Sequence, residues 1–316
     1  MSSLLSTAPV KRLFAPALRR LEARGRITAK DTAKSPTTTG SGHDSGVHAE
    51  VAELRKQVEA LRYELHYTEL LFGDLGGRGN RRPTSKQIAH LEKEIRAVTG
   101  VESPHAAVVQ AYRSIVEVEL RGVGRIAGGT MNVLGKLVTT PLLAPPNGQV
   151  LEIGTLFGLF SCCMARQMTR YGVDYRLSIV DPLVDVQIQP GRPNGSDRSG
   201  SPVSEPVLRA NLALGGVPEE RVRIRRGYST DPAARAELSD REYGVVIIDG
   251  DHTEEGVRAD LEWAEKLVAP GAIVVLDDYG DTKWPGVTKA AEGHLQDSDR
   301  FEFLGSVATS AFLRAT

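Results

Sequence analysis

The sequence predicts an α/β fold built on a doubly wound, mostly parallel sheet of seven strands with a reversed edge, preceded by a helical extension. Two observations predict it. From position 148 onward, short apolar runs alternate with stretches of helical periodicity, which indicates parallel strands joined by helical crossovers. The last two runs, at 300–306 and 309–315, have no helix between them and predict an antiparallel pair.

The first five strands are expected in QVLEIG, YRLSIVD, RVRIRRG, YGVVIID and GAIVVLDD. Helices are expected between them in FSCCMARQMTRY, EPVLRANLALGG, DPAARAEL and EEGVRADLEWAEKLV, and GVTKAAEGHL adds one before the closing pair. Both cysteines, Cys162 and Cys163, are neighbours in the first of these helices. A disulfide between neighbours would be strained, so we interpret them as core residues of a cytoplasmic protein.

Three segments precede this domain, which we place at 148–316. Residues 1–46 carry eight Lys or Arg against three Asp or Glu and end in a Thr-, Ser- and Gly-rich stretch, which predicts a disordered basic extension. Residues 73–147 combine a Gly- and Arg-rich linker with helices. Within them, 127–138 is expected either to line a pocket or to form a turn between helices.

Residues 47–72 predict a short coiled coil, because apolar residues recur at alternating steps of four and three. We expect it to make the chain a homo-oligomer, most simply a dimer. The alternative is an amphipathic helix folded back on its own domain, since the pattern lasts under four heptads. The apolar positions are Val47, Val51, Leu54, Val58, Leu61 and Leu65.

Composition excludes several classes of protein. Lys and Arg total 39 against 40 Asp and Glu, so there is no basic field across the whole protein of the kind that nucleic-acid binders use. The sequence contains no run of 18 apolar residues, so no membrane span is predicted. The Arg-rich N-terminus is interpreted as a frayed basic helix, with a targeting peptide or a membrane-surface helix as alternatives.

The ends of the first three strands are the expected ligand site of such a sheet. Glu152, Gly154 and Gly158 follow the first strand, and Gly154 permits a tight turn and close approach of a ligand. Asp181 follows the second and suits the two hydroxyls of a ribose, unless it caps its own turn. Tyr228 and Ser229 follow the third and suit an adenine, unless Ser229 begins a helix.

The fourth and fifth strands end in carboxylates. Adjacent parallel strands place Asp249 beside Asp277 and Asp278, and such a group needs a cation to offset its repulsion. Oxygen ligands suit Mg²⁺ better than zinc, and His252 is then positioned as a base. The alternative is that the loop after Asp249 simply caps the next helix, through Asp251 or Thr253.

The joint order of VLEIGTLFG, IVDPL, RGYSTD, IIDGDH, LDDY and WPGVTKA resembles that of class I S-adenosylmethionine-dependent methyltransferases. More narrowly, it is similar to the metal-dependent O-methyltransferases that include catechol O-methyltransferase and the macrocin and mycinamicin sugar enzymes. The resemblance covers about half of the chain, from Gly148 to Thr316, and implies a Rossmann-like fold.

The resemblance also implies roles for these residues. The methionine end of the cofactor would contact Glu152, Gly154, Thr155 and Gly158, the ribose would contact Asp181, and Mg²⁺ would bind Asp249, Asp277 and Asp278, with His252 as base. One position departs from the family. A serine expected to contact the cofactor carboxylate is Phe160 here, with Ser161 one step later, so either Ser161 replaces it or the contact is absent.

The predicted function is therefore methyl transfer from S-adenosylmethionine to the hydroxyl of a small molecule, a sugar, polyol or catechol. The alternatives are an NAD-dependent oxidoreductase and a non-catalytic, methyltransferase-like interaction protein. The loop at 184–206 is expected to be either a lid or disordered. Lys283 and Trp284 are expected to border the acceptor, or Trp284 to pack on its own domain.

Overall fold

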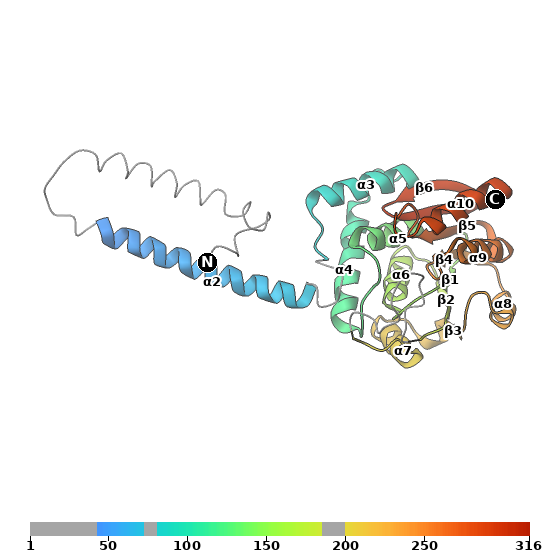
Figure 1. Cartoon of the computed structure of the whole chain (residues 1–316), viewed down its shortest axis with the longest axis horizontal. Helices are drawn as coiled ribbons and strands as arrows, with labels where there is room; N and C mark the ends of the chain where they lie inside the picture. Colours follow the sequence, from blue (N-terminus) through green and yellow to red (C-terminus); the bar gives the residue numbers. More distant parts are fainter. Residues whose placement is uncertain (1–42, 73–80, 185–199) are drawn as a thin grey trace. The chain divides into compact units, whose positions relative to one another are not determined.

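The computed structural model describes residues 43–72, 81–184 and 200–316 of the chain (Figure 1). The chain divides into two units, residues 1–64 and 65–316. The predictions for the basic extension up to residue 42 and for most of the loop at 184–206 lie outside the described residues. None of the described helices has the length and apolar character needed to cross a membrane.

The second unit contains the predicted seven-stranded sheet, in the order β3-β2-β1-β4-β5-β7-β6. All pairings are parallel except those of β7, which runs antiparallel to both β5 and β6, so the reversed strand lies one place in from the edge. The strands are β1 Gln149–Ile153, β2 Arg176–Asp181, β3 Val222–Arg226, β4 Tyr243–Ile248, β5 Val268–Asp277, β6 Phe301–Val307 and β7 Ser310–Ala315.

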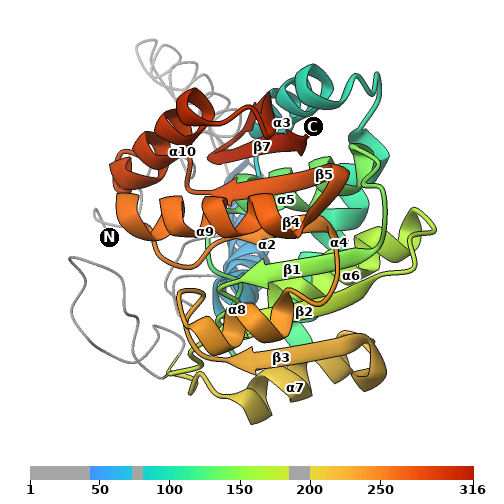
Figure 2. The same ribbon diagram turned by 90° about the vertical axis from the view of Figure 1, so that its right-hand side faces the viewer.

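Helices cover both faces of this sheet (Figure 2). One face is covered by α8 Pro232–Leu238, α9 Glu254–Leu267 and α10 Pro285–Asp297. The other is covered by α3 Ser85–Thr99, α4 His105–Arg121, α5 Thr130–Leu142, α6 Leu159–Arg170 and α7 Glu205–Leu214. A short 3₁₀ helix, η2, spans Glu219–Arg221.

The apolar strands supply two cores because alternate side chains point to opposite faces. In β4, Val245 and Ile247 pack with α4, α5 and α6, whereas Val246 and Ile248 pack with α8 and α9. Every residue of β4 is buried, which explains why its sequence is a continuous apolar run without polar alternation. Cys162 and Cys163 are both buried in the first of these cores, as predicted.

The segment at 127–138 forms most of helix α5, so the interpretation as a turn between helices is wrong. Arg81 fixes the chain that leads into it. The Arg81 guanidinium binds Glu119 and donates to the carbonyl oxygens of Ile126 at 2.6 Å and Gly128 at 3.0 Å. These bonds hold the Gly-rich stretch 122–129 against the domain and set where α5 begins.

Helix α2 spans His43–Phe72, so the predicted helix exists and starts four residues before the predicted boundary at 47. Val51, Leu61 and Leu65 of its apolar positions are exposed on the single chain. Their pairing with a second copy stays a prediction.

Candidate functional site

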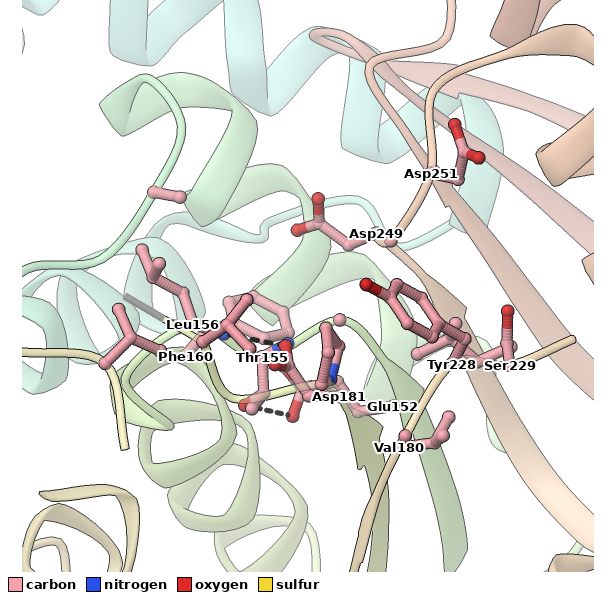
Figure 3. Close-up of a pocket in the computed structure, with 18 of the residues that line it drawn as sticks. Glu152, Thr155, Leu156, Phe160, Val180, Asp181, Tyr228, Ser229, Asp249 and Asp251 are labelled. Carbon is pink, nitrogen blue, oxygen red and sulfur yellow. Dashed lines mark hydrogen bonds between the residues drawn. The ribbon is translucent and has the colours of Figure 1, made fainter. Parts of the chain in front are cut away.

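A cavity of about 240 Å³ lies beyond the carboxyl ends of β1, β2, β3 and β4. This is where the strand order reverses, between β1 and β4, and where such sheets bind ligands. Figure 3 shows Glu152, Thr155 and Asp181 close together, with Asp249 above them in this view. The predicted residues that line the cavity are Glu152, Gly154, Thr155, Asp181, Tyr228, Ser229 and Asp249. Gly158, Ser161, His252, Asp277 and Asp278 are not among the residues that line it.

Gly154 has the left-handed backbone conformation expected of a tight turn, with φ +83°. A Cβ atom there would lie 2.3 Å from the carbonyl oxygen of Asp249. The glycine therefore lets the turn after β1 pack directly on the turn after β4. This contact brings the glycine turn and the Asp249 carboxylate to the same cavity.

Asp181 binds backbone with both of its carboxylate oxygens. Oδ2 accepts from the N–H of Thr155 at 2.7 Å and of Leu156 at 3.3 Å, and Oδ1 accepts from Leu183 at 2.7 Å. Leu156 and Leu183 both have positive φ, so the carboxylate stabilises two strained turns at the rim of the cavity. Burial raises the pKa of Asp181, against the opposing effect of these hydrogen bonds.

Glu152 is buried and accepts hydrogen bonds from the hydroxyls of Ser161 and Thr155. Burial raises the pKa of Glu152 to about 7, and the two hydroxyls oppose that shift. A cationic group that entered the cavity beside Glu152 would therefore be bound most strongly when this carboxyl is ionised.

Ser161 and Gly158 have structural contacts. The Ser161 hydroxyl donates to Glu152, so it acts on the cavity through that carboxylate, and Phe160 contributes the lining beside it. Gly158 precedes α6 with φ +74°, and a Cβ atom there would lie 2.2 Å from Leu208 Cδ1. A glycine at this position is therefore required for α7 to pack against α6.

Tyr228 and Ser229 lie on the loop between β3 and α8. The Tyr228 side chain is 49% exposed at the mouth of the cavity, and its backbone N–H donates to Asp231. The Ser229 carbonyl accepts from Arg235 at 2.6 Å. Helix α8 is preceded by Asp231, so Ser229 is not the residue that begins it.

The carboxylates after β4 and β5 meet a lysine from α5. Lys136 Nζ lies 3.1 Å from Asp249 Oδ2 and 2.8 Å from Asp277 Oδ1, and the lysine is 1% exposed. Burial alone would raise the pKa of Asp277, but the Lys136 ammonium and the Asn132 amide lower it to about 2. Burial beside Asp277 raises the pKa of Asp249. One buried ammonium thus bridges the two carboxylates.

His252 lies close to Asp249 and Asp278. Its Nε2 is 3.2 Å from Asp278 Oδ2 and 3.9 Å from Asp249 Oδ1, and its ring packs on Trp284 with centroids 4.9 Å apart. Burial lowers the pKa of His252, but the Asp278 hydrogen bond and the Asp249 charge outweigh it, so the net shift is upward. Trp284 packs within its own domain.

The rest of the loop after Asp249 caps helix α9. Thr253 is its N-cap and accepts from the Gly256 N–H at 3.0 Å, and Asp251 accepts from the Thr253 N–H at 2.8 Å. The capping interpretation is therefore confirmed for Thr253, whereas Asp251 binds the N-cap residue and also lines the cavity.

Asp249, His252 and Asp277 each offer one ligand atom, and these atoms lie within 4.8 Å of one another. Asp277 Oδ1, however, accepts from Lys136, from Asn132 at 2.8 Å and from Ser310 at 3.3 Å. These three donors, the Lys136 ammonium among them, compete with a metal for this oxygen.

Lys136 and Arg125 are the two cationic side chains of the lining that sequence reasoning missed. Both precede the domain that the motifs outline, so no strand-end pattern points to them. The signal for Lys136 was a lysine within the otherwise apolar stretch VLGKLV. Arg125 is 7% exposed, which is rare for an arginine unless it meets a polar partner.

Comparison with known proteins agrees with this geometry. Residues 151–279, which span β1 to the end of β5, match a family model described as a methyltransferase domain. No curated protein matches the chain. The matched range contains each predicted site residue, and it decides against the oxidoreductase alternative.

Three solved structures illustrate what the chain is similar to. An O-methyltransferase from Bacillus cereus in complex with SAH has 16% identity and a TM-score of 0.42, over 73% of this chain and 100% of its own. The O-methyltransferase TomG from Streptomyces achromogenes, involved in tomaymycin synthesis and solved with SAM, has 19% identity and a TM-score of 0.40, over 74% and 100%. A SAH-bound methyltransferase from Podospora anserina has 12% identity and a TM-score of 0.41, over 89% and 100%.

The matched segment begins with the first strand and ends just after the fifth, in a sheet that has the predicted strands and the single reversed one. Residues 151–279 therefore form a methyltransferase domain.

Proposed function

We propose that the chain transfers the methyl group of S-adenosylmethionine to the hydroxyl oxygen of a small molecule. One observation supports this most: the Asp249 carboxylate lines the same cavity as the glycine turn and Glu152. An acceptor hydroxyl beside Asp249 would then lie next to the methionine end of the cofactor, where the methyl group is carried.

The cofactor would lie along the strand ends. Its adenosine would contact Tyr228 and Ser229, with the ribose at the rim that Asp181 braces, and its methionine end would lie over Gly154 and Thr155. Glu152, ionised, would attract the methionine ammonium. Arg125 would bind the methionine carboxylate. This contact would replace the one from the serine that the family has at the position of Phe160.

The reaction breaks the bond between the methyl carbon and the sulfonium sulfur, and its electron pair stays on sulfur. A new bond forms between the methyl carbon and the acceptor oxygen, which loses its proton to a base. The products are a methyl ether, S-adenosylhomocysteine and a protonated base. Holding oxygen and methyl in line, away from water, supplies much of the acceleration.

Of Asp249 and His252, only Asp249 lines the cavity. Asp249 would therefore accept the proton of the acceptor hydroxyl. His252 Nε2 lies 3.9 Å from Asp249 Oδ1 and 3.2 Å from Asp278 Oδ2. Because this nitrogen donates its N–H to Asp278, His252 would stabilise the Asp249 carboxylate and would not receive its proton. The predicted role of His252 as the base is thus given to Asp249 in this proposal.

The predicted magnesium ion would use Asp249 and Asp277 with His252 or Asp278, and would supply a Lewis acid for the acceptor oxygen. No step above depends on it, because Lys136 already binds both of the first two carboxylates.

The acceptor class stays as predicted, a sugar or polyol hydroxyl or a catechol. Purified protein incubated with methyl-labelled S-adenosylmethionine and a panel of these acceptors is expected to label one class as a methyl ether. Cofactor binding in calorimetry with no labelled product from any acceptor would instead favour the non-catalytic alternative. Absence of cofactor binding would contradict the proposal.

A further inference from the structure

Lys136 is the only lysine or arginine in the described part of the chain that contacts the carboxylates after both β4 and β5. It reaches them from α5, a helix outside the segment that carries the strand-end motifs. Its side chain is 2% exposed, and a buried ammonium is stable only when it is paired in this way.

The surrounding contacts fix Lys136 in place. Asn132, one helical turn earlier on α5, donates to the same Asp277 oxygen at 2.8 Å, so two residues of one helix bind one carboxylate. The Phe160 ring lies 4.9 Å from Nζ, a cation–π contact. The phenylalanine that departs from the family pattern is therefore in contact with the lysine.

Charge balance follows from the same contacts. The Asp249 and Asp277 pair is bridged by one ammonium, and Asp278 has its own partner in His252. The repulsion between the carboxylates, for which a metal was expected, is thus reduced by side chains. The ammonium has three N–H donors, of which these two carboxylates take two, and Lys136 lines the cavity where an acceptor oxygen would lie.

We propose that Lys136 is a built-in cation that takes the place of a divalent metal at the Asp249–Asp277 pair, so that methyl transfer needs no metal ion. The role of Lys136 in methyl transfer rests on the proposed function. The expectation that the wild-type protein does not bind a divalent metal at this pair is independent of it. The third N–H of Lys136 donates to the acceptor oxygen as its negative charge develops, which is the electrostatic task that a metal would otherwise perform.

The test starts with the full-length wild-type protein after dialysis against EDTA. Mn²⁺ is titrated in and followed by its electron paramagnetic resonance signal and by calorimetry, and methyl transfer is measured with and without EDTA. The inference predicts no saturable Mn²⁺ binding at millimolar concentration and turnover unchanged by EDTA. One tightly bound Mn²⁺ per chain, or turnover lost in EDTA and restored by Mg²⁺ or Mn²⁺, overturns it.

Lys136→Met provides the complementary variant. Without the ammonium the carboxylates are left unpaired, and the variant is expected to gain Mn²⁺ binding and to lose metal-free turnover by about 100-fold or more. Lys86→Met, which removes an exposed lysine of α3, is the matched control and should resemble the wild type in both readouts. Metal-free turnover of Lys136→Met at the wild-type rate overturns the inference.

The two proposals fail separately. If the wild type methylates no acceptor, the proposed function is contradicted, while the Mn²⁺ titration still decides whether Lys136 excludes a metal. If Lys136→Met does not fold, the wild-type titration and the EDTA assay give the decision on their own.

Discussion

Asp181 Oδ2 accepts the backbone N–H of Thr155 at 2.7 Å, so the end of β2 holds the turn that follows β1. The other oxygen of the same carboxylate holds Leu183, at the start of the next loop. Asp181 is 9% exposed. The residue predicted to bind ribose thus organises the backbone of the cavity as well.

Asp181→Asn should destabilise the protein by about 1–3 kcal/mol, because the amide has one acceptor oxygen and must turn its NH₂ group toward a backbone N–H. Urea denaturation of the protein without cofactor measures the change. A variant as stable as the wild type with weakened cofactor binding would show that Asp181 serves only the ribose.

Asp249→Asn should lower the rate of methyl transfer by about 100-fold or more, since an amide cannot accept the acceptor proton. Cofactor affinity should change little, because Asp249 faces the acceptor in the proposed arrangement. Rate and affinity are measured separately, by single-turnover transfer and by calorimetry. Asp281→Asn, in the loop after β5, is the matched control, and an equal loss in both variants would contradict the assignment.

Arg125→Gln should weaken binding of S-adenosylmethionine by about 10- to 100-fold, the loss of a charge-assisted hydrogen bond. Calorimetry with S-adenosylhomocysteine, which has the same carboxylate, checks it. Arg121→Gln removes an exposed arginine of α4 as a control. Unchanged affinity in Arg125→Gln would place the cofactor carboxylate elsewhere.

Glu152→Gln should change how stability depends on pH. Because the pKa of Glu152 is raised from 4.5 to about 7, the folded state holds this proton more tightly than the unfolded chain. Its contribution to stability is therefore complete below about pH 4.5 and is lost as the pH rises to about 7, by roughly 3 kcal/mol in total. The free energy of unfolding of the wild type minus that of Glu152→Gln should fall across this range. A constant difference would contradict the raised pKa.

Replacing Leu54 and Leu61 of α2 by Asp should convert a dimer into a monomer in analytical ultracentrifugation, if the predicted coiled coil forms. The methyl transfer rate should be unchanged, since both residues lie outside the cavity lining. Exchange of the exposed Glu53 and Glu59 for Gln is the control. A wild-type chain that sediments as a monomer would favour the helix folded back on its own domain.

The sheet could be predicted because each strand is a compact apolar run with turn residues at its ends. Val245 to Ile248 must be buried on both faces, and only a sheet with helices on each side provides that. The places of Gly154, Asp181 and Asp249 followed because strand ends of a parallel sheet share one edge.

What the sequence did not indicate was the contribution of α5 to the site. Lys136 is brought to Asp277 by packing between segments that are 141 residues apart (277 minus 136), and periodicity says nothing about such contacts. The carboxylates alone therefore predicted an external cation, whereas the fold supplies one internally. The directions of the Ser161 and Asp278 side chains could not be predicted either. They depend on Glu152 and His252, which tertiary packing brings into contact with them.

The most direct measurement of the central claim is single-turnover transfer from methyl-labelled S-adenosylmethionine to the best acceptor of the panel, with wild type and Asp249→Asn side by side. We predict that the wild type forms labelled methyl ether and S-adenosylhomocysteine in equal amounts, and that Asp249→Asn binds the cofactor but forms almost none. Equal product from both proteins would contradict the account.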